Sequence, residues 1–228
     1  MSKDEPDKLG IHCTCNFGSV DENSIYYDVR QEVDKKMLDY KLVKIKCQLK
    51  SNESIKGIQF IYRNINTCEE EALINIKPND YNLIEQEMSL NGEELVDLRT
   101  WLSDEIVLIG FEVTTKKGRT KKFGYGNNEQ LRRCPDFENK DKVIVGFGVV
   151  ADDKKYVTSL YAYYMNMTTY LFHLYSGVMR LKIKTKDENY KKTVRNKLDN
   201  MNEKNKILYR ICSLPDNQFF NIIKYALC

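Results

Sequence analysis

The sequence is poor in proline, glycine and tryptophan, and it has no long apolar run. Four Pro and eleven Gly among 228 residues exclude collagen-like and Pro/Gly-rich low-complexity classes. The longest apolar segment, residues 160–172, is interrupted by polar residues, whereas a membrane helix needs roughly 18 apolar residues in succession. Residues 1–10 are charged and do not resemble a secretory signal. We therefore expect an intracellular, cytoplasmic protein without a membrane span.

A large excess of charge of either sign is also missing. The chain has 36 Lys and Arg against 33 Asp and Glu, a net charge of +3. A dedicated nucleic-acid-binding protein normally shows a strong basic excess, so no nucleic-acid partner is expected. Hydrophobic residues make up 42% of the chain, which is enough for a packed core and argues against extensive disorder.

Residues typical of catalysis and of metal binding are scarce. There are two His, and the sequence contains no GxSxG, P-loop, HExxH or GxGxxG motif in a suitable context, so no enzyme activity and no cofactor are expected. The seven Cys are odd in number and scattered, which indicates reduced thiols of an intracellular protein. His12, Cys13 and Cys15 could form half of a zinc site. No second pair stands at a suitable spacing, and an alternating strand explains the pattern equally well, so no metal is expected.

From residue 42 onward the hydrophobic pattern has a period of two. Many short strands separated by turn signals indicate an all-β sandwich, barrel or prism. Gly118 supplies the positive φ that the turn at 116–118 requires. Residues 21–40 are expected to form a short helix or an ordered insertion. The strands are expected at 11–17, 42–47, 55–62, 72–76, 87–90, 106–115, 119–123, 143–150 and 156–164.

After residue 166 the pattern becomes helical. We expect a helical extension over 166–228, preceded by a β domain over 11–165 and an N-terminal tail over 1–10. The last predicted helix is unusually apolar, and an exposed apolar patch usually marks an interface. The alternative is that this helix caps the β domain of the same chain. The candidate interface residues are Phe219, Phe220, Ile222, Ile223 and Tyr225.

Four segments in order resemble jacalin-like lectin domains. Residues 42–62 resemble the first repeat of that family, and 109–120 resemble its strand leading into a lysine-glycine-arginine turn. Residues 123–126 resemble the glycine-aromatic stretch that follows, and 143–148 the hydrophobic glycine-phenylalanine strand near the end of the domain. The resemblance implies a mainly β fold, a jacalin-like β-prism of three four-stranded sheets around a pseudo-threefold axis. It also implies binding without catalysis.

The resemblance implies a sugar site on loops at one end of the prism. In the family an Asp carboxylate and backbone amides hold the sugar hydroxyls, because a carboxylate accepts several hydrogen bonds at once. In this chain Thr158 aligns with that Asp, the loop is longer, and Gly18 alone represents the glycine-rich N-terminal loop. We expect the sugar chemistry to be eroded. The candidate loop residues are Gly18, Asp152, Asp153, Lys154, Lys155, Tyr156 and Thr158.

A basic hairpin is a second candidate site. Its cations could hold an acidic partner, although a solvated hairpin tip is the favoured interpretation. Neighbouring residues of a strand point to opposite faces, so the patch is smaller than its sequence suggests. The candidate patch consists of Lys116, Lys117, Arg119, Lys121 and Lys122.

Two functions follow from these patterns. The first is a non-catalytic intracellular scaffold or interaction subunit of a larger protein assembly; a cytoskeletal, ciliary or other microtubule-associated assembly is one setting that fits. The alternative is a lectin for mannose-type or related glycans, in which Asp152 or Asp153 replaces the missing Asp. The partners of the first are proteins and the ligand of the second is a glycan.

Overall fold

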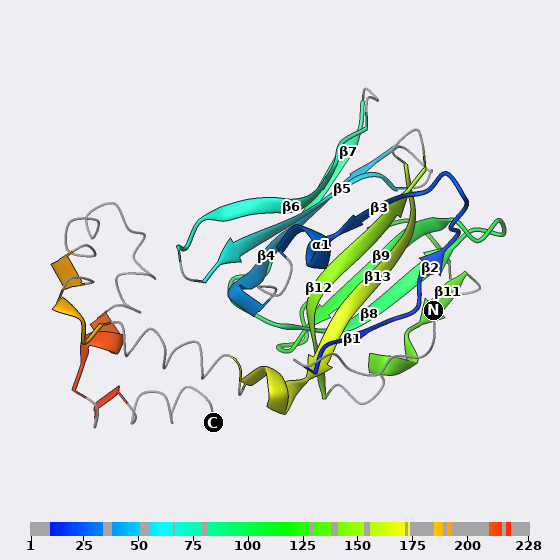
Figure 1. Cartoon of the computed structure of the whole chain (residues 1–228). Helices are drawn as coiled ribbons and strands as arrows, with labels where there is room; N and C mark the ends of the chain where they lie inside the picture. Colours follow the sequence, from blue (N-terminus) through cyan, green and yellow to red (C-terminus); the bar gives the residue numbers. More distant parts are fainter. Residues whose placement is uncertain are drawn as a thin grey trace. The chain divides into compact units, whose positions relative to one another are not determined.

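The computed structural model divides the chain into two units, residues 1–167 and 168–228, and each is described here by itself (Figure 1). The residues that the structure describes are 10–33, 38–50, 55–65, 67–78, 82–127, 130–137, 141–152, 156–171, 173, 185–188, 191–192, 210–215 and 218–219.

The first unit contains one antiparallel sheet in the strand order β6-β5-β4-β7. Its strands are β4 (Tyr40–Leu49), β5 (Ile55–Asn64), β6 (Glu70–Ile76) and β7 (Ile84–Ser89). Along β4, apolar residues on one face alternate with charged residues on the other, as in a sheet with one buried and one solvated face. On the solvated face Lys46 pairs with Glu85 and Glu87 of β7.

A second group of strands has the order β10-β9-β8-β11. It consists of β8 (Leu95–Leu102), β9 (Leu108–Thr115), β10 (Thr120–Gly124) and β11 (Leu131–Arg133), and a 3-10 turn at Pro135–Phe137 follows β11.

The third group is centred on β12 (Lys142–Ala151) and β13 (Val157–Asn166). β1 (His12–Cys13) and β2 (Phe17–Gly18) pair one after the other with β13, and β3 (Ile25–Asp28) pairs with the free side of β12. The second and third groups are joined through one residue pair, Ile144 with Leu95. The short strands β1 and β2 lie along the same edge of β13 and together take the place of one strand, so the third group counts as four-stranded. The first unit therefore consists of three four-stranded sheets, and the predicted β-prism is confirmed.

Aromatic side chains from different sheets fill the interior of the prism. Phe60 of the first sheet stacks on Phe147 of the third with ring centroids 4.4 Å apart, and Phe111 stacks on Phe123 at 4.9 Å. All four rings are fully buried, and burying each contributes about 1.5–3 kcal/mol. Tyr62 adds a polar link, because its hydroxyl accepts a hydrogen bond from the amide of Phe147 at 3.2 Å.

Several sequence-based expectations need correction. Within 21–40 the expected short helix is present as the five-residue α1 (Val29–Val33), but the segment also forms strand β3, which was not expected and which pairs with β12 of the third sheet. β8 and β11 were not expected at all. Asp97 and Arg99 alternate with buried residues of β8, so a period-two signal was present in this strand. On the outer face of the sheet these two side chains form an ion pair, with 3.2 Å between the Arg99 Nε and the Asp97 carboxylate.

In residues 168–228 the structure describes helical residues at 168–171, 173, 188, 191–192, 210–213 and 218–219. The buried Thr185 hydroxyl donates to the carbonyl of the buried Cys212 at 2.8 Å. Most of the helices expected at 171–181, 188–211 and beyond 215 lies outside the described residues, so the helical extension stays a prediction. No helix among the described residues is long and apolar enough to cross a membrane.

Candidate functional site

The turn between β12 and β13 lies where the resemblance places a sugar site. The Asp152 amide donates to the Tyr156 carbonyl at 3.0 Å, and the Tyr156 amide donates to Asp152 Oδ1 at 2.7 Å. Gly18 of β2 pairs with Ser159, the residue after Thr158. The structure therefore brings four of the predicted loop residues to one end of the prism: Gly18, Asp152, Tyr156 and Thr158. The other three, Asp153, Lys154 and Lys155, lie outside the described residues.

The described polar side chains of this turn are engaged within it. Asp152 uses one carboxylate oxygen to hold the amide of Tyr156. The Thr158 hydroxyl donates to the carbonyl of Val150 at 3.3 Å, and the Tyr156 ring lies under the Lys56 ammonium at 4.0 Å, a cation–π contact. A threonine hydroxyl offers one donor, whereas a carboxylate offers several acceptor positions. Thr158, which the sequence analysis aligns with the Asp of jacalin-like lectins, therefore offers a bonded hydroxyl and no carboxylate at this turn.

Gly18 has a structural reason to be glycine. Its φ is +129°, and a Cβ at this position would lie 2.1 Å from the Thr158 carbonyl oxygen, so a larger residue would separate β2 from β13. Beneath it, the Ser159 hydroxyl is fully buried and has no hydrogen-bond partner among the described residues. At Gly18 the backbone of β2 is thus closely packed against the backbone of β13.

A buried carboxylate that the sequence did not reveal holds β3 in place. Asp28 Oδ2 accepts hydrogen bonds from the hydroxyls of Tyr161 at 2.9 Å and Tyr163 at 2.7 Å, and Oδ1 accepts from the Arg30 amide at 2.7 Å. Burial, and then the carboxylate of Asp28, raise the pKa of both tyrosines well above the ordinary value. The Tyr161 ring occupies the space over Gly148, where a Cβ would lie 2.0 Å from the ring. The only sequence signal was that Tyr161 and Tyr163 share one face of a strand.

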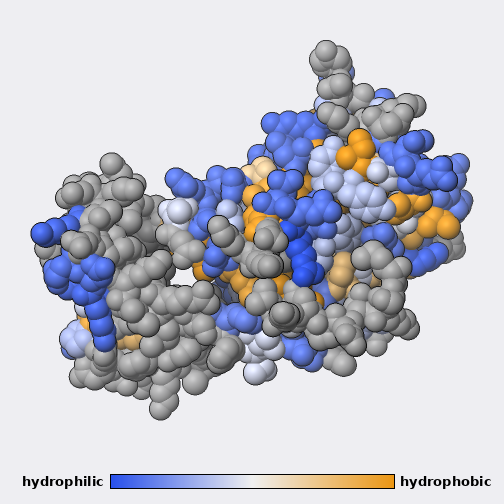
Figure 2. Space-filling view, in the orientation of Figure 1, coloured by the Kyte–Doolittle hydropathy of each residue, from blue (hydrophilic) through white to orange (hydrophobic). Residues whose placement is uncertain are grey.

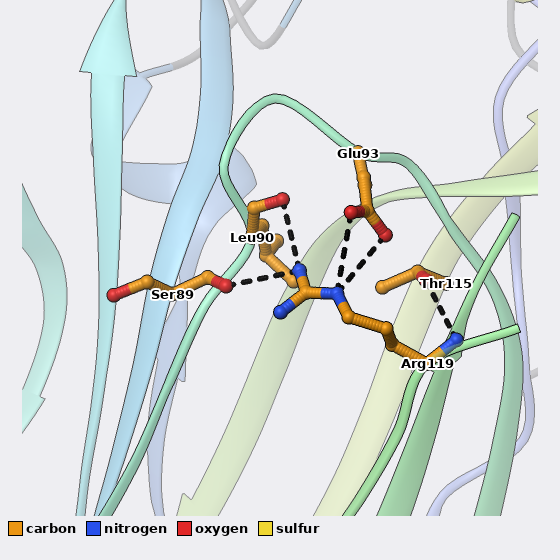
Figure 3. Close-up of polar contacts among 5 residues, drawn as sticks. All are labelled: Ser89, Leu90, Glu93, Thr115 and Arg119. Carbon is orange, nitrogen blue, oxygen red and sulfur yellow. Dashed lines mark hydrogen bonds and ion pairs between the residues drawn. The ribbon is translucent and has the colours of Figure 1, made fainter. Parts of the chain in front are cut away.

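The predicted basic patch is divided by the fold. Arg119 turns back onto the β7–β8 connection, where its Nε lies 3.2 Å from the Glu93 carboxylate and its Nη2 donates to the carbonyls of Ser89 and Leu90 (Figure 3). The Arg119 amide also donates to the Thr115 hydroxyl at 3.2 Å. A hydrogen bond from Thr115, and then the hydrogen bond and positive charge of the Arg119 guanidinium, lower the pKa of Glu93. Arg119 therefore fastens the β9–β10 hairpin to the neighbouring sheet.

Lys122 is also used within the fold. Its ammonium donates to the Gly126 carbonyl at 2.7 Å and lies over the Trp101 ring at 4.1 Å. Lys116 and Lys117 are exposed at the hairpin tip, and Lys121 is half-buried. Two of the five predicted cations thus have their charge engaged within the chain, which leaves a smaller basic tip.

The remaining candidates offer less. Phe219 is fully buried, and the other predicted interface residues (Phe220, Ile222, Ile223 and Tyr225) lie outside the described residues, so that interface stays a prediction. The described residues include no group of His, Cys, Asp or Glu arranged to hold a metal ion. His12 stacks on Tyr164 with centroids 5.3 Å apart. The six described cysteines are free thiols, and burial raises the pKa of the Cys134 thiol to about 12.

Comparison with known proteins gives structural similarity only. No protein-family model and no curated protein matches the chain significantly. A mannose-binding lectin from champedak is similar over 66% of this chain and 93% of its own, with 19% identity and a TM-score of 0.48. Calystegia sepium agglutinin covers 68% and 95%, with 13% identity and a TM-score of 0.49. A mannose-specific jacalin-related lectin from Morus nigra covers 71% and 99%, with 14% identity and a TM-score of 0.48. The sheet pairing described above, and not these similarities, carries the assignment of the fold.

Proposed function

We propose that this chain is a non-catalytic interaction subunit, which uses its β-prism as a rigid scaffold within a larger intracellular protein assembly. The observation that carries the proposal is the internal use of the polar groups that the structure describes in the β12–β13 turn. The Asp152 carboxylate caps its own turn, and the Thr158 hydroxyl is bonded to Val150. A ligand rich in hydroxyls would have to displace these contacts. A protein partner can instead use the side chains that surround the turn.

Two further observations support this proposal. The described cysteines are free, as in a reducing compartment, and Arg119 and Asp28 fasten the edges of the sheets so that the prism presents a fixed surface. The exposed basic tip with Lys116 and Lys117 suits an acidic protein surface. A cytoskeletal or ciliary assembly is one setting in which such a subunit would serve.

A specific observation favours glycan binding as the second candidate function. Gly18, Asp152, Tyr156 and Thr158 gather at one end of the prism, and the second carboxylate oxygen of Asp152 remains at that turn. Structurally similar proteins include mannose-binding lectins. In this alternative, Asp152 or Asp153 would accept hydrogen bonds from a mannose-type glycan.

An affinity-tagged full-length chain, purified gently from cell extract with and without free mannose, tests the two functions. Mass spectrometry that finds a stoichiometric set of proteins, unchanged by mannose, supports the interaction subunit. Glycoproteins that elute with mannose, and lose affinity when Asp152 is replaced by Ala, support the lectin. Recovery of the tagged chain alone in both preparations would contradict the interaction subunit.

A further inference from the structure

The exposed large apolar side chains of the described residues are few, and each lies in or beside a loop or strand terminus. Figure 2 shows that much of the visible surface of the first unit is hydrophilic, with apolar areas between. Five large hydrophobic residues stand out by an exposed fraction of 40% or more, and Ile106 is the most exposed at 58%. They are Val20, Ile25, Tyr26, Ile84 and Ile106.

Strand pairing places the first three at the β12–β13 turn. Ile25 and Tyr26 pair with the last two residues of β12, directly before that turn. β2 runs antiparallel to β13 and ends at Gly18, opposite Ser159, so the chain proceeds from Gly18 to Val20 toward the start of β13. These three apolar residues therefore lie beside one turn of the third sheet, with Ile25 and Tyr26 on opposite faces of β3.

Ile84 belongs to the same end of the prism. It pairs with Leu49, the last residue of β4, beside the connection between β4 and β5. At the start of β5, Lys56 contacts the ring of Tyr156, which lies in the β12–β13 turn. The start of β5 thus adjoins Tyr156, the residue that precedes β13.

Ile106, in the β8–β9 loop, lies at this end too. The Gly124 amide donates to the Gln86 side chain of β7 at 3.3 Å, and Gly124 pairs with Gly110 near the start of β9. The start of β9, which this loop precedes, therefore lies at the same end of the prism as the first half of β7. The basic tip and the Arg119 contacts lie at the opposite ends of these strands. We name the five residues together the apolar end.

Ile106 is held in a costly conformation. Its φ is +62°, in the left-handed region that β-branched residues rarely adopt. Its amide donates to the Ser103 carbonyl at 2.9 Å, and the Ser103 hydroxyl accepts from the Val107 amide at 3.1 Å. An Asn or Gly would take this conformation more easily. An exposed isoleucine kept at such a position is typical of a residue retained for contact and not for stability.

Among the residues that the structure describes, the exposed charges around the apolar end are more often acidic than basic; Asp153, Lys154 and Lys155 lie outside those residues. Asp104 and Glu105 precede Ile106 directly and are both exposed. Other exposed charged residues described at this end include the acidic Asp21 and Glu22 and the basic Lys50 and Lys77, while the exposed Glu85 is already paired with Lys46.

We propose that the apolar end docks a protein segment whose apolar side chains are flanked by Lys or Arg. This inference rests on the proposed interaction function and names the surface that carries it. Acidic side chains around apolar anchors complement a basic rim on the partner. A second copy meeting this one end to end would bring like charges together, and an anionic membrane surface would repel the same acidic groups.

Three tagged full-length chains test the proposal. They are the wild type, an end variant (Tyr26→Ser with Ile106→Asn) and a control variant at two exposed residues by the start of β6, outside every candidate site (Glu69→Ser with Glu71→Ser). Each is used for purification from extract with quantitative mass spectrometry. In parallel, p-benzoyl-phenylalanine at position 26 of the otherwise wild-type chain cross-links the bound segment. Thermal unfolding followed by fluorescence of the single Trp101 checks that each variant is folded.

We expect the end variant to recover about tenfold less partner than the wild type, because it lacks two apolar anchors of the interface. The control variant should recover as much partner as the wild type. The cross-linked peptide should contain apolar residues next to Lys or Arg, and recovery should fall as salt is raised. The Ile106→Asn change should leave the unfolding temperature unchanged or higher, which separates lost binding from lost folding.

Other outcomes overturn the proposal in distinguishable ways. A partner that the end variant still recovers fully leaves the interaction function standing and refutes the apolar end as its surface. A wild-type chain that recovers no protein refutes both. Cross-linking to a second copy, or co-sedimentation of the wild type but not the end variant with phosphatidylserine-containing vesicles, would assign this surface to self-association or to a membrane.

Discussion

Replacing Asp28 with Ala removes the acceptor that three donors share inside the prism. The Tyr161 and Tyr163 hydroxyls and the Arg30 amide all point at this carboxylate, and Asp28 is only 7% exposed. Since water cannot easily replace the lost acceptor, the hydroxyls would be left buried without a partner. These bonds add to the backbone pairing that holds the edge strand β3 against β12.

The expected loss is large for a single substitution. A hydrogen bond to a charged group contributes about 1.5–3 kcal/mol, and such bonds are not additive when they share one acceptor. We therefore expect Asp28→Ala to lower the free energy of unfolding by about 3–5 kcal/mol. Asp28→Asn should cost about 2–3 kcal/mol, because its amide nitrogen places a donor against donors. Tyr161→Phe and Tyr163→Phe remove one bond each and should cost about 1–2 kcal/mol.

Urea unfolding followed by Trp101 fluorescence measures these losses, since the single tryptophan lies in β8 of the same prism. A double-mutant cycle between Asp28 and Tyr163 should give a coupling energy of about 1–2 kcal/mol. A loss below about 1 kcal/mol for Asp28→Ala would refute the reasoning, because the hydroxyls would then have found other acceptors. A coupling energy of zero would likewise show that Tyr163 does not depend on the carboxylate.

Three further predictions concern the same unit. Gly148→Ala should destabilise it by about 1–3 kcal/mol in urea unfolding, because the new Cβ would lie 2.0 Å from the Tyr161 ring; an unchanged midpoint would contradict this packing. Arg119→Ala should lower the free energy of unfolding by about 1–2 kcal/mol, since two carbonyls and Glu93 lose their partner. The neighbouring change Lys117→Ala should alter it by no more than about 0.5 kcal/mol. Equal effects would argue against the Arg119 contacts shown in Figure 3. Stability should also fall above pH ~10, where the unfolded chain loses protons that the folded chain keeps, by about 1.4 kcal/mol per pH unit for each buried tyrosine of raised pKa. The buried tyrosines in question are Tyr62, Tyr161 and Tyr163. Urea midpoints measured at increasing pH, together with phenolate absorbance at 295 nm, test this prediction. Phenolate formed by these tyrosines while the chain is still folded would refute it.

The sequence alone determined the class of the fold and most of its strands. Period-two alternation marked β4, β5 and β9, and a continuous apolar run marked β12, because each strand has one face or its full length buried. The Lys-Lys-Gly turn predicted the β9–β10 hairpin, since only the local chain decides such a turn. The same local reasoning missed β8, where Asp97 and Arg99 satisfy each other across the outer face.

Only the tertiary structure decided what the candidate residues do. Arg119 and Lys117 look alike in sequence, yet one clamps two sheets and the other is exposed, because the partners of Arg119 come from a connection almost thirty residues away. Asp28 meets Tyr161 across 133 positions, and no local pattern signals such a pair. The five residues of the apolar end come from four separate segments. Their gathering follows from the way three sheets align their loops, a long-range consequence of strand pairing that spacing along the chain does not contain.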